Sequence, residues 1–232
     1  TLDENPDDVS LSNLIDQSLN LIAKFPSLLV YCYQACNYKH FNKSLIIHNP
    51  VEEYSIAQNV LHMLRSDNQF TELEAEVLDL ILVIHAEHGG GNNSTFTSHV
   101  VSSTRTDTYS SISASIGALK GPMHGGANSM VTKMVEDIKK NTNPYDEVKL
   151  KEYLKKIFNK ETFDKKGRIY GMGHAVYTIS DPRAVLLKKK AYELAKEKNA
   201  LDGGMGRLFF IIPLFVLFIN KHYLCPDFIT IL

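Results

Sequence analysis

The chain has 232 residues, of which 44% are hydrophobic and 22% charged, the balance of a globular protein with one large domain or two modest ones. The formal net charge of −1 excludes a strongly basic or acidic protein, so no nucleic-acid or membrane partner is expected. Cys32, Cys36 and Cys225 have no disulfide or redox spacing, which favours a reducing compartment.

Helical periodicity dominates the first third of the chain. A helix is predicted over 10–35, with Ser10 as its N-cap and a break or kink at Pro26. Residues 41–50 are predicted to form a loop, and 55–65 a short amphipathic helix.

The middle of the chain is apolar. Thr71 and Glu74 form a capping box for a helix over 73–88, which is apolar on most faces and predicted to be deeply buried. Three glycines end it. The helix predicted over 107–120 is rich in Ser, Ala and Gly, so another helix could approach it closely, in a dimer or in the core of one chain.

Lysine-rich helices follow. They are predicted over 127–141, 143–158 and 183–199, the last with Asp181 as N-cap and Pro182 at the first helical position. Because helical patterns dominate and few segments alternate with period two, we expect an all-α protein. The helices before Asn128 are apolar and those after it amphipathic, which indicates two domains. The large helical domain would cover 1–125, and a smaller one 126–232.

Two further segments resist assignment to this pattern. The opening stretch TLDENPDD is acidic and is not expected to be a signal peptide. The longest apolar run, residues 208–219, is interrupted by Pro213 and is too short to span a bilayer as a helix.

Three histidine-bearing segments stand beside glycines. HAEHGGG carries His85 and His88 on one helix face, GPMHGGAN carries His124, and GMGHAVY carries His174, with Arg183 following in DPR. His124 precedes a helix N-terminus, which favours anions, and an arginine offers a carboxylate a forked partner. These features predict a site for a small polycarboxylate, with imidazoles for proton and hydrogen-bond work.

Each feature also has a simpler interpretation. A histidine beside glycine is common in an ordinary turn, and Arg183 could be a surface charge. His85 and His88 could ligate zinc, but HAEH is not HExxH and no third ligand completes a set, so no metal is predicted.

The run EAEVLDLILVIHAEHGGGNNSTFTSHVVSSTRTDTYSSISASIGALKGPMHGGAN resembles the core signature of the citrate synthase family, and GMGHAVYTISDPRA resembles its second histidine motif. The resemblance covers about residues 7–199. It implies a nearly all-α fold of two domains that close over substrate. It also implies an acyltransferase of the tricarboxylic acid cycle, which condenses acetyl-CoA with oxaloacetate to give citrate and CoA.

The resemblance also implies roles for residues of these motifs. The resemblance implies that His124 hydrogen-bonds the acetyl carbonyl and stabilises the enol, while His174 hydrogen-bonds the oxaloacetate carbonyl. His88 and Arg183 match positions that hold oxaloacetate or citrate. The backbone expected to contact CoA comprises Tyr170, Gly171, Met172 and Gly173.

The chain departs from the family at its ends. The family's base is an aspartate in a motif like NVDFYSG, which this sequence lacks, and Asp227 in KHYLCPDFITIL is the nearest candidate. The chain looks clipped at both ends, as a fragment, a sequence lacking internal pieces or a naturally shortened relative.

The resemblance leaves the precise activity and setting open. We expect a homodimer without a tightly bound cofactor, in the cytoplasm or alternatively the mitochondrial matrix. The alternatives for function are a 2-methylcitrate synthase that uses propionyl-CoA and a non-catalytic truncated relative.

Overall fold

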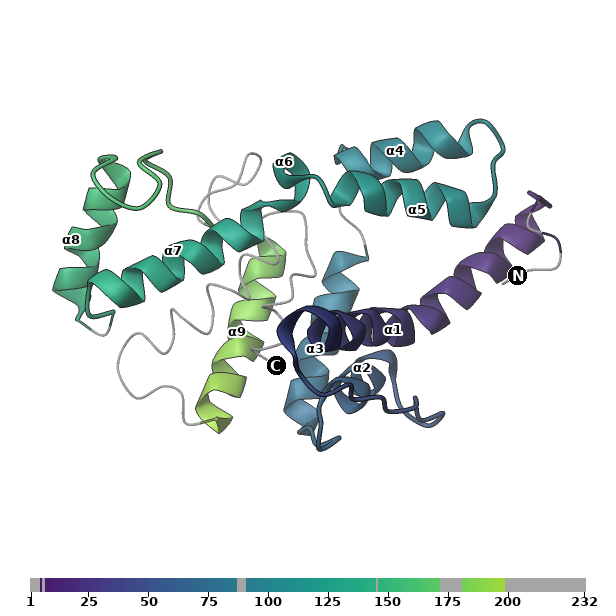
Figure 1. Ribbon diagram of the computed structural model, residues 1–232, viewed down its shortest axis with the longest axis horizontal. Coiled ribbons are helices and arrows are strands. Elements are labelled where there is room, and N and C mark those ends of the chain that lie inside the picture. Colours follow the sequence, from purple (N-terminus) through teal and green to yellow (C-terminus); the bar gives the residue numbers. More distant parts are fainter. Residues whose placement is uncertain (1–4, 6, 87–90, 145, 172–180, 199–232) are drawn as a thin grey trace. The chain divides into compact units, whose positions relative to one another are not determined.

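The computed structural model describes residues 5, 7–86, 91–144, 146–171 and 181–198, and within these ranges it contains nine α-helices and no strand (Figure 1). The all-α prediction is confirmed. The chain divides between Lys120 and Gly121 into two compact units, while the domain boundary expected between 125 and 126 stays a prediction. No helix in the described ranges has both the length and the apolar content needed to cross a membrane.

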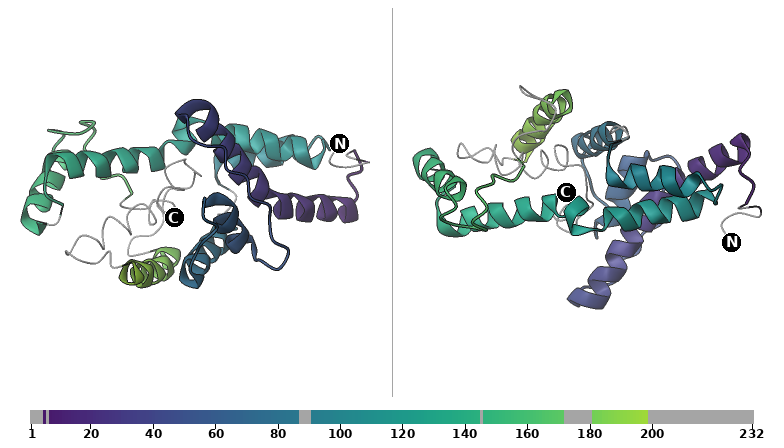
Figure 2. Two further views of the ribbon diagram at one scale, coloured as in Figure 1. Left: turned by 60° about the horizontal axis from the view of Figure 1, so that its bottom comes forward. Right: turned by 90° about the horizontal axis from the view of Figure 1, so that it is seen from above.

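Helix α1 (Leu11–Phe41) is the longest element of the first unit, which ends at Lys120. It is capped by Ser10 as predicted, because the Ser10 Oγ accepts the amide of Asn13. The helix continues through Pro26 without a break, but Figure 2 shows that its axis bends, as a proline inside a helix requires. It ends at Phe41 rather than at 35, and its C-cap Asn42 is in the left-handed conformation.

Helices α2 (Ile56–Leu64) and α3 (Glu72–His85) follow, and both begin with a capping box. The Thr71–Glu74 box is the predicted one. The deep burial predicted for α3 holds for one face, where Val77 and Leu78 are buried, but not for the other, where Leu82 and Val83 are 39% and 61% exposed. The reason is that α2 packs along α3, whereas the opposite face of α3 has no comparable cover among the described elements.

Helices α4 (Asn93–Ser102) and α5 (Thr108–Leu119) form a hairpin, and they lie side by side in Figure 1. The sequence did not predict α4, because its serines and threonines are poor helix formers. Asn92 nevertheless caps it by accepting the Thr95 amide at 2.8 Å. Of the small residues of α5, Ser111 is buried, whereas a Cβ at Gly117 would meet nothing within 4 Å, so the close approach of another helix stays a prediction.

The second unit begins with the short α6 (Pro122–Gly125) and continues with α7 (Ala127–Asn141), α8 (Glu147–Phe158) and α9 (Pro182–Glu197). Helices α7 and α8 share a core. Its buried members are Met134, Ile138, Leu150, Tyr153 and Ile157. Asp181 caps α9 and Pro182 occupies its first turn, as predicted.

Candidate active site

His124 lies inside a single helical turn, where the sequence suggested a bare turn before a helix. Its backbone N–H donates to the Gly121 carbonyl at 3.0 Å, and the Gly126 N–H donates to the Pro122 carbonyl at 2.9 Å. The His124 side chain is half-buried. The turn needs no unusual backbone freedom, because Pro122 presets its first φ angle and the two hydrogen bonds hold the rest.

Gly126 joins this turn to α7 and cannot be replaced without a rearrangement. A Cβ atom at this position would lie 2.4 Å from the Pro122 carbonyl oxygen, far inside van der Waals contact. In the described part of the chain, no side chain caps α6 or α7. His124 therefore lies next to the start of a 15-residue helix whose end favours an anion.

Tyr170 lies at the end of the loop that follows α8, and its ring packs against α7. It contacts the buried Val131 and Val135, and its ring centroid is 6.1 Å from that of Phe163 in an edge-to-face arrangement. Its phenol donates a hydrogen bond to the Asp164 carboxylate. The next residue, Gly171, is buried with a φ of 83°, which favours glycine.

The Tyr170–Asp164 pair perturbs the ionisation of both partners. Burial and the negative charge of Asp164 raise the pKa of Tyr170 to about 12. Burial acts to raise the pKa of Asp164 as well, but the hydrogen bonds from Tyr170 and the Lys166 amide outweigh it and lower that pKa below its ordinary value. At neutral pH the pair is thus a neutral phenol that donates to a carboxylate.

The loop between α8 and Gly171 contains several left-handed residues. Lys160, Phe163 and Lys165 have φ angles of 65°, 56° and 55°, which residues other than glycine adopt rarely. Such backbone persists where its surroundings fix it. The phenol of Tyr153 helps to fix this loop: it lies 3.1 Å from the Thr162 hydroxyl and donates a hydrogen bond to Asp137 at 2.7 Å.

Arg183 lies in the first turn of α9, and its guanidinium is held by Asp181. Its Nη2 is 2.7 Å from Oδ2 of Asp181 and its Nε is 3.1 Å from Oδ1. The same carboxylate accepts the Arg183 amide at 2.9 Å as the helix cap. Because the Asp181 side chain is only 2% exposed, the ion pair fixes the guanidinium at the start of the helix. The sequence identified Arg183 and the cap but missed this ion pair, for which the D-x-R spacing is the available signal.

The remaining predicted residues lie outside the described ranges: His88, Met172, Gly173, His174 and Asp227. The structure thus places His124, Tyr170, Gly171 and Arg183 in the second unit and brings Tyr170 onto α7. His85 is exposed, and its Nδ1 lies 2.7 Å from the carbonyl oxygen of Ile81 in its own helix. Within the described residues, no group of three or more His, Cys, Asp or Glu side chains could hold a metal.

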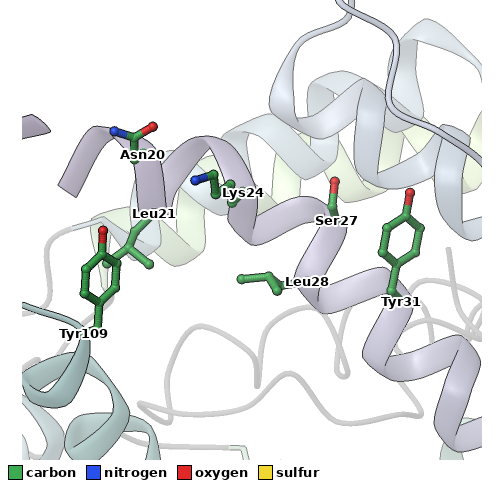
Figure 3. Close-up of a pocket in the computed structure, with 7 residues that line it drawn as sticks. All are labelled: Asn20, Leu21, Lys24, Ser27, Leu28, Tyr31 and Tyr109. Carbon is green, nitrogen blue, oxygen red and sulfur yellow. The ribbon is translucent and has the colours of Figure 1, made fainter. Parts of the chain in front are cut away.

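A small pocket of about 230 Å³ lies in the first unit, between α1 and α5. Figure 3 shows Tyr31 and Tyr109 at its two ends, with Lys24 and Leu28 between them. None of the predicted site residues lines it, and it is smaller than typical ligand pockets. We therefore assign it no substrate.

Comparison with known proteins relates these features to a family. The sequence profile of the family described as citrate synthase, C-terminal domain, matches residues 2–203. The chain belongs to the citrate synthase family. Citrate synthase 2 of Bacillus subtilis is 37% identical over 204 residues, which cover 87% of this chain and 48% of that relative. The 2-methylcitrate synthase of Shewanella oneidensis is 33% identical over 189 residues, covering 82% of this chain and 44% of the relative.

Solved citrate synthase structures confirm the expected fold. The crystal structure of citrate synthase from Pyrobaculum aerophilum matches with a TM-score of 0.63 and 28% identity, over 90% of this chain and 53% of that one. Citrate synthase from Thermotoga maritima matches with a TM-score of 0.59 and 25% identity, over 93% of this chain and 62% of that one. This member of the citrate synthase family spans about half the length of the relatives named above.

Proposed function

We propose that this chain contributes to the active site of a citrate synthase, which converts acetyl-CoA, oxaloacetate and water into citrate and CoA. The observation that carries the proposal is the placement of His124. It lies in a turn fixed by Pro122 and Gly126, beside a helix end that has no capping side chain among the described residues. A histidine next to a helix N-terminus suits an oxygen that gains negative charge during the reaction.

Each proposed residue has one role in the condensation. His124 hydrogen-bonds the thioester oxygen and passes it a proton as Asp227 removes one from the methyl carbon, so an enol forms. His174 donates to the oxaloacetate carbonyl, and the enol carbon attacks the carbonyl carbon to form the new C–C bond. Water then cleaves the thioester, which releases CoA.

Substrate binding falls to a second set of groups. Arg183 and His88 bind the carboxylates of oxaloacetate, and the backbone over 170–173 contacts CoA. The buried ion pair with Asp181 supports this role for Arg183, because it sets the direction of the guanidinium before substrate arrives. The reaction needs no tightly bound cofactor, since acetyl-CoA is a co-substrate.

We also propose that the protein acts as a homodimer. One face of α1 supports this, because it carries a row of apolar side chains spaced three and four residues apart. Its members are 39–75% exposed in the single chain: Leu11, Ile15, Leu19, Ile22 and Phe25.

His124→Ala tests the proposed function. We expect turnover, followed as CoA release with a thiol reagent, to fall about 10²–10³-fold, the loss typical of one oxyanion donor. Oxaloacetate affinity, measured by titration calorimetry, should not change, because His124 binds the enol oxygen. His40→Ala is the matched control, since His40 is an exposed histidine of the first unit.

The assay needs a blank without substrate, because Cys32 is exposed and reacts with the reagent. Large loss of oxaloacetate affinity in His124→Ala would contradict the assigned role. If the unaltered chain neither binds these substrates nor releases CoA, the chain is not an active citrate synthase.

A 2-methylcitrate synthase is the second candidate, since the Shewanella oneidensis relative of that name is 33% identical. The two reactions differ by one methylene on the acyl group, so the same assay with propionyl-CoA separates them. A kcat/KM higher with propionyl-CoA than with acetyl-CoA would favour the second candidate.

A further inference from the structure

Tyr170 makes contacts that the backbone role assigned to it does not require. Its ring contacts Val131 and Val135, two buried residues of α7. Its phenol reaches back across the loop to Asp164, whose Oδ1 also accepts the Lys166 amide at 3.0 Å. A single side chain therefore links the loop, its own backbone and α7.

Tyr170 stands where the loop after α8 meets the segment proposed to contact CoA. Tyr170 and the buried, left-handed Gly171 are the first two residues of that segment, 170–173. The loop before it contains the left-handed residues Lys160, Phe163 and Lys165. Backbone of this kind keeps one conformation only where other contacts hold it. Backbone hydrogen bonds hold Lys160 and Lys165, and the side chains of Tyr170 and Tyr153 add contacts to Asp164 and Thr162.

We propose that Tyr170 is a positioning residue that fixes the start of the CoA-binding segment against α7 through its hydrogen bond to Asp164 and its packing on Val131 and Val135. This inference rests on the proposed function. Tyr170 acts through the backbone of Gly171 and does not itself react. Asp164 is its partner, and in a loop whose other charged residues are mainly Lys and Arg its carboxylate is also balanced by Lys166 and Arg168.

The central experiment measures the Kd of CoA for the whole chain by titration calorimetry, in the wild type and in Tyr170→Phe. Phenylalanine keeps the ring on Val131 and Val135 and removes only the hydroxyl, so the fold is retained. We expect the Kd of CoA to rise about tenfold, the scale of one hydrogen bond to a charged group, while the Kd of oxaloacetate stays the same. Asp164→Asn should raise the Kd of CoA in the same direction.

Tyr153→Phe is the matched control. It removes the phenol hydrogen bond to Asp137 and the contact with Thr162 in the same unit, but it leaves Tyr170 and Gly171 bonded as before. It should lower stability and, because Thr162 is further from Gly171 along the loop, raise the Kd of CoA by clearly less than Tyr170→Phe does. An equal loss of CoA affinity in Tyr153→Phe would show a general structural effect and overturn the positioning role.

A spectroscopic titration tests the hydrogen bond itself. Since the pKa of Tyr170 is raised to about 12, the phenolate absorbance that Tyr170→Phe removes should develop near pH 12. In Asp164→Asn the same absorbance should move towards pH 10, the ordinary range of tyrosine. A Tyr170 that titrates near 10 in the wild type would overturn the proposed link.

The possible failures are distinguishable. A wild-type chain that binds no CoA contradicts both the proposed function and this inference. If the wild type binds CoA and Tyr170→Phe binds it equally tightly, only this inference is contradicted.

Discussion

Helix α8 buries apolar side chains and exposes charged ones, whereas α1 buries amides and exposes a row of apolar side chains. In α8 the buried residues are Leu150, Tyr153 and Ile157. In α1 they are Gln17, Pro26, Val30, Gln34 and Asn37, and five large apolar residues between Leu11 and Phe25 are exposed. Both helices pack through apolar clusters, but α1 buries side-chain amides as well and exposes apolar surface.

Buried hydrogen bonds add to the hydrophobic contacts that hold α1, where Val30 packs on Met63 and Leu64 of α2. The Gln34 Nε2 donates to the Leu64 carbonyl at 3.0 Å, and the Gln17 Oε1 accepts from Thr108. Buried amides with partners specify how a helix docks, even though each contributes little net free energy. The apolar row of α1 is then available to a second surface, which agrees with the proposed homodimer, whereas α8 has its partner within its own unit.

Ile157→Ala should have the largest effect on stability. Ile157 is fully buried in the α7–α8 core, and removing its side chain leaves a cavity. We expect the free energy of unfolding, measured with urea, to fall by about 2–5 kcal/mol. Val148→Ala on the same helix is the control, since Val148 is 66% exposed and should change stability by less than about 0.5 kcal/mol. Equal losses in the two variants would mean that the α7–α8 core does not form.

The sequence predicted helices well where local chemistry decides their ends. Helix α7 begins and ends at the predicted residues 127 and 141, and both the Thr71–Glu74 box and the Asp181–Pro182 start are present. Helix α4 was missed, because an Asn92 cap and tertiary packing outweigh its weak propensity. Periodicity gives the apolar faces of a helix but not what covers them, so the burial of α3 was overestimated.

The site was also predictable only where local sequence decides the structure. His124 and Arg183 stand in short motifs that can be read directly, and the structure supplies the local contacts of both. The Tyr170–Asp164 bond could not be read, since a loop with left-handed residues has no periodic pattern to predict which side chains meet. His88, His174 and Asp227 lie outside the described residues and stay predictions.

Gln34→Met should have an intermediate effect and tests how α1 is held. Methionine has a similar volume, but it cannot donate to the Leu64 carbonyl, which loses its buried partner. We expect a loss of about 1–3 kcal/mol in the free energy of unfolding. Lys39→Met places the same residue at an exposed position of α1 and should be nearly neutral. A neutral Gln34→Met would show that hydrogen bonding does not hold α1 to α2.

Leu19→Gln should have the smallest effect on the single chain, and it separates the two sides of α1. Leu19 is 60% exposed within the apolar row, and leucine and glutamine have similar helix propensities. The free energy of unfolding at low protein concentration should therefore change by less than about 0.5 kcal/mol. Self-association, measured by sedimentation, should weaken, because a polar amide would replace apolar surface in the proposed dimer contact. If Leu19→Gln instead lowers stability as much as Gln34→Met does, the row is covered within one chain and α1 does not differ from α8 in the way described above.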